Sequence, residues 1–438
     1  MERKIEIFLK KWKKDASGKP AIIYGNKQIG KTFTVLKFGE KEYKNVVYFN
    51  TENNPEIEDL FKKEKAIDKI IVNLSLISGE TILKEDTLIV LDNLVNVDIV
   101  KGMKLFGSDH SQYNIIGITS RREKLTEFKG EEIQFKQMTE MDYEEYLWAH
   151  DERNLANLIR ESFEKRKTCP FHKVAMDLFH EYLQTGGFPE AVVAKMNGKS
   201  QYEIDAIIQK ILDVYKKEIS LADNLIDITR GIEVINSIPH QLKKENKKFQ
   251  YGVIGTGRRA KEYESTINYL INNQLAYRSY KITEVKSPLS SCKDKDSFKL
   301  YLPDDGLLYS MLHLNYKQFI TNESLKETLY ENHIAKTLVE SGYVLYYYQS
   351  DGKAEVNFVV QNRMGKIIPM EITTKTNSKA KSLSVFMKKY PVEEAYRITE
   401  NNFQTKKEVR YIPIYSVFFL FFSFILTVSS LSWNRPDS

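Results

Sequence analysis

One eight-residue stretch near the start of the chain constrains the fold more than any other. It fits the phosphate-binding pattern G-x-x-x-x-G-K-[ST] at every fixed position. The stretch consists of Gly25, Asn26, Lys27, Gln28, Ile29, Gly30, Lys31 and Thr32. An apolar run at 21–24 precedes it, and residues 33–38 continue as the start of a helix. The order strand, glycine loop, helix turns backbone N–H groups toward phosphate oxygens, so it predicts a P-loop in an α/β domain.

Each part of the loop has an expected role in holding a nucleotide. Lys31 supplies a positive charge for the β- and γ-phosphates, and the Thr32 hydroxyl is suited to hold Mg²⁺. The N-terminus of the following helix adds positive potential. We therefore expect residues 25–32 to bind ATP together with Mg²⁺.

The composition is that of a folded protein with several domains. The chain has 438 residues, of which 28% are charged and 12% aromatic, and this length accommodates about two to four domains. A net charge of +6 is compatible with a nucleic-acid partner but does not require one. Cys169 and Cys292 lie far apart, so they predict neither a disulfide framework nor a zinc site and favour a cytoplasmic location.

Four short apolar runs alternate with helical stretches before residue 150. They cover residues 21–24, 45–50, 87–92 and 114–119. Runs of this kind are typical of strands that are covered on both faces of a parallel sheet. Because the carboxyl ends of such strands meet at one edge, the polar residues that follow them should surround the P-loop. The sequence therefore predicts an ATP-binding domain over residues 1–150, with Glu52, Asp92, Thr119 and Ser120 at this edge.

The acidic residue expected opposite the P-loop is Asp92, which would order water around Mg²⁺ on the side away from Thr32. In many NTPases of this kind a Glu follows this Asp and polarises the attacking water, but here the residue is Asn93. An amide can hold water but cannot accept its proton. We therefore expect ATP binding with slow or impaired hydrolysis. Glu52 is the alternative base, although we favour its interpretation as a loop acid.

Basic residues follow the fourth strand. Ser120, Arg121 and Arg122 are candidates for a phosphate sensor and for a cationic finger that acts on a neighbouring subunit of a homo-oligomer. Solvated arginines are the alternative interpretation, and we favour it.

The middle of the chain reads as two further regions. Residues 151–228 have helical spacing, predict a helical lid, and place His180 on the surface. Residues 229–298 combine helices with a hairpin, which is the outline of a winged helix with residues 261–273 in the recognition position. Arg258, Arg259 and Lys261 add positive charge there, which makes DNA a candidate partner. Protein contact is the alternative.

The last large region, residues 299–417, has helical Glu331 followed by strands at 344–348, 355–360 and 367–373. In a metal-dependent nuclease, a helical Glu, a strand acid and a Glu two residues before a Lys hold Mg²⁺ and orient the attacking water. Here Asn357 takes the position of the acid, and Thr373 follows Glu371 at the position of the lysine. A site shifted to Glu355 and Lys375 is an alternative, but we favour a domain that keeps the fold without cleavage.

The order of these motifs resembles the large family of prokaryotic AAA-type ATPases that carry a C-terminal domain of unknown function. The segments that carry the resemblance are residues 25–32, 87–92, 138–147, 186–190, 300–308, 331–332 and 369–372. The resemblance implies ATP binding by the P-loop and Asp92, a winged helix, a PD-(D/E)xK nuclease-like domain of restriction-endonuclease type, and association with DNA. This chain departs from the usual residues at Asn93, Asn357 and Thr373, where the family has Glu, Asp and Lys.

Together these features predict an ATP-binding protein whose nucleotide state controls a C-terminal module that associates with DNA. Two alternatives are an ATP-regulated metal-dependent DNA nuclease and an NTPase switch that binds a protein partner rather than nucleic acid.

The C-terminal end is strongly apolar, with no charged residue between Arg410 and Arg435. Residues 412–431 are long enough for a tail anchor, with Lys406, Lys407 and Arg410 on the cytoplasmic side. The resemblance instead implies that residues 412–417 form the last strand of the nuclease-like sheet. The rest of the apolar tail, within residues 418–438, is then too short to span a bilayer easily, and we favour this interpretation over membrane insertion. An altered C-terminal end is a third interpretation.

Overall fold

The computed structural model describes residues 1–108, 112–121, 132–220, 227–350, 355–374, 381–406 and 408–420. The chain divides into two compact units. Unit 1 comprises Met1–Met141 with two short segments, Phe188–Glu190 and Asn272–Leu275. Unit 2 comprises Asp142–Gly187, Ala191–Ile271 and the chain from Ala276 onward.

Unit 1 is built on a parallel sheet with the strand order β2-β3-β4-β1-β5. The strands are β1 (Ala21–Tyr24), β2 (Asn45–Asn50), β3 (Thr87–Asp92), β4 (Asn114–Thr119) and β5 (Gln134–Gln137). Four of them occur at the residues that the apolar runs predict. The fifth, β5, was not predicted, because its residues are half-buried and two of the four are glutamines.

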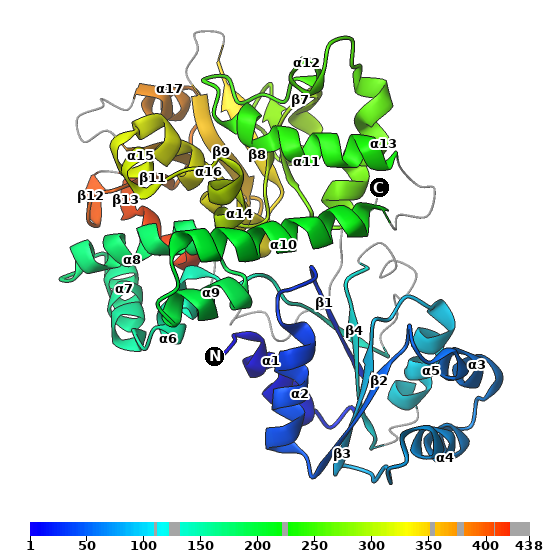
Figure 1. The fold of residues 1–438 in the computed structure, drawn as a ribbon. Coiled ribbons are helices and arrows are strands. Elements are labelled where there is room, and N and C mark those ends of the chain that lie inside the picture. Colours follow the sequence, from blue (N-terminus) through cyan, green and yellow to red (C-terminus); the bar gives the residue numbers. More distant parts are fainter. Residues whose placement is uncertain are drawn as a thin grey trace. The chain divides into compact units, whose positions relative to one another are not determined.

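Helices cover both faces of this sheet. They are α1 (Ile5–Lys13), α2 (Lys31–Glu42), α3 (Pro55–Lys63), α4 (Ile67–Ser78) and α5 (Val97–Ser108). Helices α1 and α2 lie on one side, and α3, α4 and α5 lie on the other (Figure 1). Phe61, Leu74 and Met103 from the latter three helices pack with Phe49 and Leu91 of the sheet in one buried core. Such double coverage explains why the strands read as nearly continuous apolar runs.

Unit 2 begins with helices and adds a mixed sheet of eight strands in the order β12-β13-β11-β10-β9-β8-β6-β7. Its first helices are α6 (Tyr143–Ala149), α7 (Arg153–Lys165), α8 (His172–Thr185), α9 (Pro189–Met196), α10 (Gln201–Ser220), α11 (Ile228–Leu242), α12 (Tyr251–Ile254) and α13 (Ala260–Asn272). The first two residues of α9 and the last residue of α13 belong to the short segments of unit 1. The later ones are α14 (Asp305–Met311), α15 (Tyr316–Thr321), α16 (Glu323–Glu340) and α17 (Lys381–Lys389). The helical character of the described residues after 150 agrees with the sequence pattern, while the role of a lid stays a prediction.

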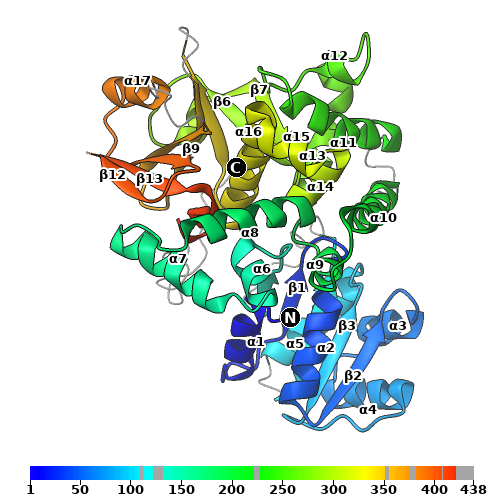
Figure 2. The same ribbon diagram turned by 60° about the vertical axis from the view of Figure 1, so that its left-hand side comes forward.

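The strands of unit 2 are β6 (Tyr277–Ile282), β7 (Lys293–Tyr301), β8 (Leu345–Gln349), β9 (Glu355–Gln361), β10 (Ile367–Thr373), β11 (Ala395–Thr399), β12 (Gln404–Lys406) and β13 (Val409–Pro413). Helices α16 and α17 lie on opposite sides of this sheet (Figure 2). The strands expected at 344–348, 355–360 and 367–373 are therefore present, within a sheet that extends further in both directions.

The hairpin predicted as the wing of a separate domain belongs to this sheet. Strands β6 and β7 pair antiparallel, as a hairpin should, but β6 also pairs in parallel with β8. Position 298, where we predicted a domain boundary, lies inside β7. A local sequence pattern identifies the hairpin but not β8, which pairs with β6. The boundary predicted between residues 229–298 and residues 299–417 therefore falls within a single sheet.

Two further sequence expectations are corrected by unit 2. His180 is buried rather than on the surface: its Nε2 lies 2.8 Å from the Tyr330 hydroxyl, and burial lowers the pKa of His180 to about 4. Residues 412–417 are not one strand, because β13 ends at Pro413 and a buried 3₁₀ helix follows at Ile414–Phe419.

The tail-anchor interpretation falls mostly on residues 421–438, which lie outside the described residues. Residues 412–420 contribute a strand end and buried side chains to unit 2, so they do not begin a membrane helix. Within the described ranges, we find no helix that combines the length and apolar character needed to cross a bilayer.

Candidate nucleotide-binding site

The P-loop connects β1 to α2, and its two fixed glycines are needed for its shape. A Cβ atom on Gly25 would lie 2.0 Å from the backbone oxygen of Met138. Gly30, the N-cap of α2, has a φ of 84°, in the left-handed region that glycine adopts most readily. A side chain at the first position would therefore clash, and one at the second would be strained.

Three buried side chains support the loop. Arg3 donates from Nη1 to the Ile29 oxygen (2.9 Å) and from Nη2 to the Thr139 oxygen (2.7 Å). Asn26 donates from Nδ2 to the Glu140 carboxylate at 3.0 Å. The loop is thus held from the side of α1 and from the segment after β5. Sequence reasoning missed Arg3 and Glu140, although Glu140 belongs to one of the segments that carry the family resemblance.

Lys31 points back into the loop. Its Nζ donates to the oxygens of Gly25 (2.9 Å) and Asn26 (2.6 Å), and the residue is only 8% exposed. A buried ammonium enclosed by backbone groups is a strong point charge for a phosphate, because little water screens it.

Thr32 and Asp92 meet directly. The Thr32 hydroxyl donates to Asp92 Oδ2 at 2.7 Å, and the backbone N–H of Asn93 donates to Oδ1 at 2.7 Å. The Tyr48 hydroxyl also donates to Oδ2, at 3.1 Å. Burial, followed by the charge of Asp92, raises the pKa of Tyr48 to about 12, so this hydroxyl keeps its proton. Sequence reasoning missed Tyr48, since a tyrosine within an apolar strand gives no local signal.

The side chain of Asn93 is bound to the neighbouring strand. Its Nδ2 donates to Asn50 Oδ1 at 3.2 Å, and its backbone oxygen accepts from the Thr51 hydroxyl at 2.9 Å. Asn93 has a φ of 56°, a conformation that asparagine tolerates better than most residues. Glu52 is exposed, and its backbone N–H donates to the same Asn50 oxygen at 3.1 Å.

The end of β4 completes the edge of the sheet. The Thr119 oxygen accepts from the Gly25 N–H at 3.2 Å, and its hydroxyl accepts from the Arg121 N–H at 3.0 Å. The backbone of Arg121 therefore lies next to Thr119, while its role as a sensor or finger stays a prediction. Arg122 lies outside the described residues. Asp92, Thr119 and the P-loop meet at this edge in the order that the strand ends predict.

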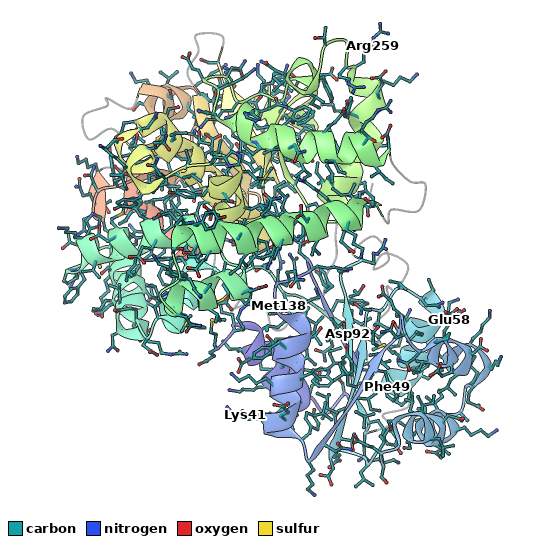
Figure 3. The ribbon with its side chains drawn as sticks, viewed as in Figure 1. Lys41, Phe49, Glu58, Asp92, Met138 and Arg259 are labelled. Atoms are coloured by element: carbon teal, nitrogen blue, oxygen red, sulfur yellow. The ribbon has the colours of Figure 1, made fainter. Side chains whose placement is uncertain are left out.

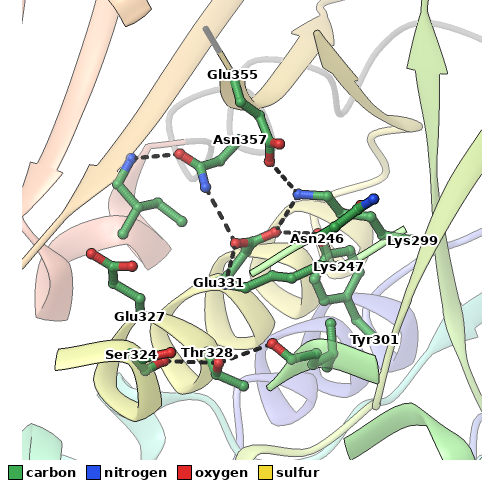
Figure 4. Close-up of polar contacts among 12 residues, drawn as sticks. Asn246, Lys247, Lys299, Tyr301, Ser324, Glu327, Thr328, Glu331, Glu355 and Asn357 are labelled. Atoms are coloured by element: carbon green, nitrogen blue, oxygen red, sulfur yellow. Dashed lines mark hydrogen bonds and ion pairs between the residues drawn. The ribbon is translucent and has the colours of Figure 1, made fainter. Parts of the chain in front are cut away.

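A second cluster lies in unit 2, around the residues predicted as a degenerate nuclease site (Figure 4). Glu331 on α16 is 2% exposed and accepts at Oε1 from Lys299 (2.9 Å) and Tyr301 (2.7 Å). Its Oε2 accepts from Lys247 (2.8 Å) and Asn357 (3.2 Å). Although burial alone would raise it, the ammonium groups of Lys247 and Lys299 hold the pKa of Glu331 well below its ordinary value.

The other predicted members of this cluster divide into two groups. Glu355 joins Glu331, since its Oε1 accepts from Lys299 at 2.5 Å. Glu371 instead accepts from Arg397 Nη2 (2.9 Å) and from the backbone N–H of Leu383 in α17 (3.3 Å). Burial raises the pKa of Glu371 despite this arginine.

The remaining predicted members do not complete a metal site. Thr373 ends β10, and Lys375 lies outside the described residues. In the part of the chain that is described, no group of three or more His, Cys, Asp or Glu residues is placed to hold a metal ion.

Comparison with known families agrees with the geometry of unit 1. Residues 17–147 match a family described as an AAA domain. This segment is an AAA-type P-loop ATPase domain. Residues 176–318 match a domain of unknown function (DUF8612), and residues 326–417 match another (DUF4143). Neither description assigns a winged helix, a nuclease or a DNA-binding role.

Two solved structures are similar to the chain at low sequence identity. None of the curated proteins compared with the chain matches it. The fold is similar to the Walker-type ATPase PABY2304 of Pyrococcus abyssi at 12% identity and a TM-score of 0.41, over 71% of this chain and 95% of that one. It is also similar to a variant of RuvB from Thermotoga maritima at 12% identity and a TM-score of 0.29, over 66% and 90% of the chains.

The residues of the AAA-type domain fit ATP and Mg²⁺. Thr32 and Asp92 provide paired oxygen donors, which Mg²⁺ prefers, and Lys31 provides the buried positive charge. The N-cap of α2 is Gly30, which lacks a side chain that could cover the first N–H groups of the helix. The donor set thus has the chemistry that phosphate and Mg²⁺ need.

Proposed function

We propose that this chain binds ATP with Mg²⁺ through the P-loop and Asp92 and hydrolyses it slowly, so that the ATP-bound state persists. The observation that carries the proposal is Asn93, which follows Asp92 and donates its amide N–H to Asn50. An amide in this position orients water but takes no proton from it, and loss of a general base typically slows a reaction by about 10²–10⁴-fold.

Different residues of the site bind phosphate, bind Mg²⁺ and orient Asp92. Lys31 holds phosphate oxygens, and Thr32 and Asp92 hold Mg²⁺, whose bound charge neutralises the phosphates. Tyr48 and the Asn93 N–H fix the orientation of the Asp92 carboxylate through their hydrogen bonds. The site therefore has the residues that bind phosphate and Mg²⁺, but Asn93 cannot take a proton from the attacking water.

Replacing Asn93 by glutamate should raise the steady-state rate of ATP hydrolysis. The backbone at Asn93 is left-handed and less favourable for glutamate, so we expect a gain of about tenfold, below the full effect of a general base. Asn93→Gln is the matched control, because the glutamine side chain is as long as that of glutamate but has no carboxylate. We expect it to give no gain in rate. Fast hydrolysis by the unaltered chain would contradict the proposal and direct attention to Glu52.

The proposal extends to the C-terminal module, whose association with DNA would depend on the nucleotide state. It is supported by the net charge of +6 and by three exposed basic residues at the start of α13, namely Arg258, Arg259 and Lys261. Figure 3 labels Arg259 at the edge of unit 2. Phosphate contacts by such residues weaken steeply as salt rises.

Binding of a fluorescent duplex by the full chain should therefore fall strongly between low and physiological salt. Arg259→Glu combined with Lys261→Glu should weaken it further and reduce the salt dependence, whereas Lys317→Glu, an exposed lysine on α15, should change it little. Absence of binding at low salt, with and without ATP, would overturn the DNA proposal and favour a switch that contacts protein. We do not propose cleavage, since Glu355 is paired with Lys299 rather than placed with Glu371.

A further inference from the structure

In unit 2, the side-chain ammonium of Lys299 lies between the carboxylate groups of Glu331 and Glu355. Figure 4 shows Glu331 from α16 and Glu355 from β9 directed at the end of the Lys299 side chain. Lys299 Nζ lies 2.9 Å from Glu331 Oε1 and 2.5 Å from Glu355 Oε1. Two carboxylates from different elements thus share one positive charge, and the lysine that supplies it is 2% exposed.

The hydrogen bonds of Glu331 are saturated around this ammonium. Each carboxylate oxygen accepts from two donors, and those donors are Lys299, Tyr301, Lys247 and Asn357. A carboxylate has about four lone-pair directions in all. Asn357 is fixed in turn, because its Oδ1 accepts from the Ile372 N–H at 3.0 Å.

The charges of the cluster are balanced as well. Glu331 and Glu355 contribute two negative charges, and Lys247 and Lys299 contribute two positive ones. A divalent cation added to this set would leave an excess of positive charge in a buried place, which is strongly unfavourable. Loss of the Lys299 ammonium would reverse this balance and free oxygen atoms of both Glu331 and Glu355, which are hard donors of the kind that Mg²⁺ and Mn²⁺ prefer.

We propose that Lys299 takes the place of a divalent cation in this cluster, and that removal of its side chain creates a Mn²⁺ site between Glu331 and Glu355. The unaltered C-terminal module then folds around an internal cation and has no need of a metal. Lys299 contacts both carboxylates. Lys247 contacts Glu331 but not Glu355, and its side chain is more exposed than that of Lys299.

The test measures Mn²⁺ binding to the full chain without nucleotide, by electron paramagnetic resonance and by thermal unfolding. All proteins carry Asp92→Ala, so that the P-loop site does not contribute. We expect Mn²⁺ to raise the Tm of Lys299→Ala by several degrees and to leave the parent unchanged. Lys247→Ala is the matched control, and because it keeps Lys299 it should show no Mn²⁺ response.

Two further variants keep the proposal falsifiable. Adding Glu331→Gln to Lys299→Ala should remove the Mn²⁺ response, which assigns it to this cluster. Lys299→Ser serves where the alanine variant folds poorly, and its yield of folded protein should increase with Mn²⁺. A parent protein whose Tm rises with Mn²⁺ through Glu331, or folded Lys299 variants that bind no Mn²⁺, would overturn the proposal.

Discussion

Replacing Lys31 by alanine should weaken ATP binding by about 100-fold or more. The buried ammonium contacts two backbone oxygens of the P-loop, and in the complex it would bond phosphate oxygens instead. A hydrogen bond to a charged group contributes about 1.5–3 kcal/mol, and a loss of about 3 kcal/mol corresponds to roughly a hundredfold in Kd. Titration with a fluorescent ATP analogue in the presence of Mg²⁺ measures the change.

Lys41→Ala is the control for this variant. Lys41 is an exposed lysine at the opposite end of α2, where Figure 3 labels it, so its removal tests the loss of a positive charge from the same helix. We expect its Kd to stay within about twofold of the unaltered chain, as for surface substitutions in general. Circular dichroism of both variants would show whether the fold is retained. Equal Kd values for Lys31→Ala and Lys41→Ala would contradict a nucleotide role for the P-loop.

Replacing Glu331 by alanine should lower the free energy of unfolding of unit 2 by about 3–5 kcal/mol. The substitution leaves Lys299 buried with only Glu355 as a carboxylate partner and removes the acceptor for the Tyr301 hydroxyl. Breaking a buried ion pair from one side typically costs this much, because the remaining charge is uncompensated. Calorimetry of the full chain measures this change. ATP should stabilise unit 1, so the transition of unit 2 is the one whose temperature does not change when ATP is added.

The same carboxylate predicts a pH dependence with a definite sign. The pKa of Glu331 is held well below its ordinary value of 4.5, so its contribution to stability is present above that pH and is lost as the pH falls further. In the Glu331→Gln variant, the free energy of unfolding should therefore fall less steeply as the pH is lowered into the acidic range. Glu327→Gln, one turn earlier on α16 and half-buried, should leave the acid profile nearly unchanged. An equal effect of both substitutions would argue against the special position of Glu331.

Features that depend on neighbouring residues in the sequence were predictable. The P-loop motif, four of the five strands of unit 1, and the meeting of Asp92 with Thr32 all follow from local apolar runs and from the rule that strand ends share an edge. The strand β5 carries no such run and was missed.

Features that depend on distant pairing were not predictable. Arg3 supports the P-loop from the start of the chain, and nothing near it in sequence marks it as buried. The hairpin of β6 and β7 is recognisable by itself, but its parallel partner β8 lies more than sixty residues along the chain from β6. Lys247 and Lys299 belong to a chain with 65 Lys and Arg residues, where a lysine is ordinarily expected in solvent.

The central claim is that this chain holds ATP without turning it over quickly, and one measurement tests it most directly. ATP binding and ATP hydrolysis are followed together on one sample of the unaltered protein with Mg²⁺. We predict saturable binding and a turnover number far below about 10 s⁻¹, the median for enzymes. Saturable binding with turnover near that value, or no binding at millimolar ATP, would contradict the account.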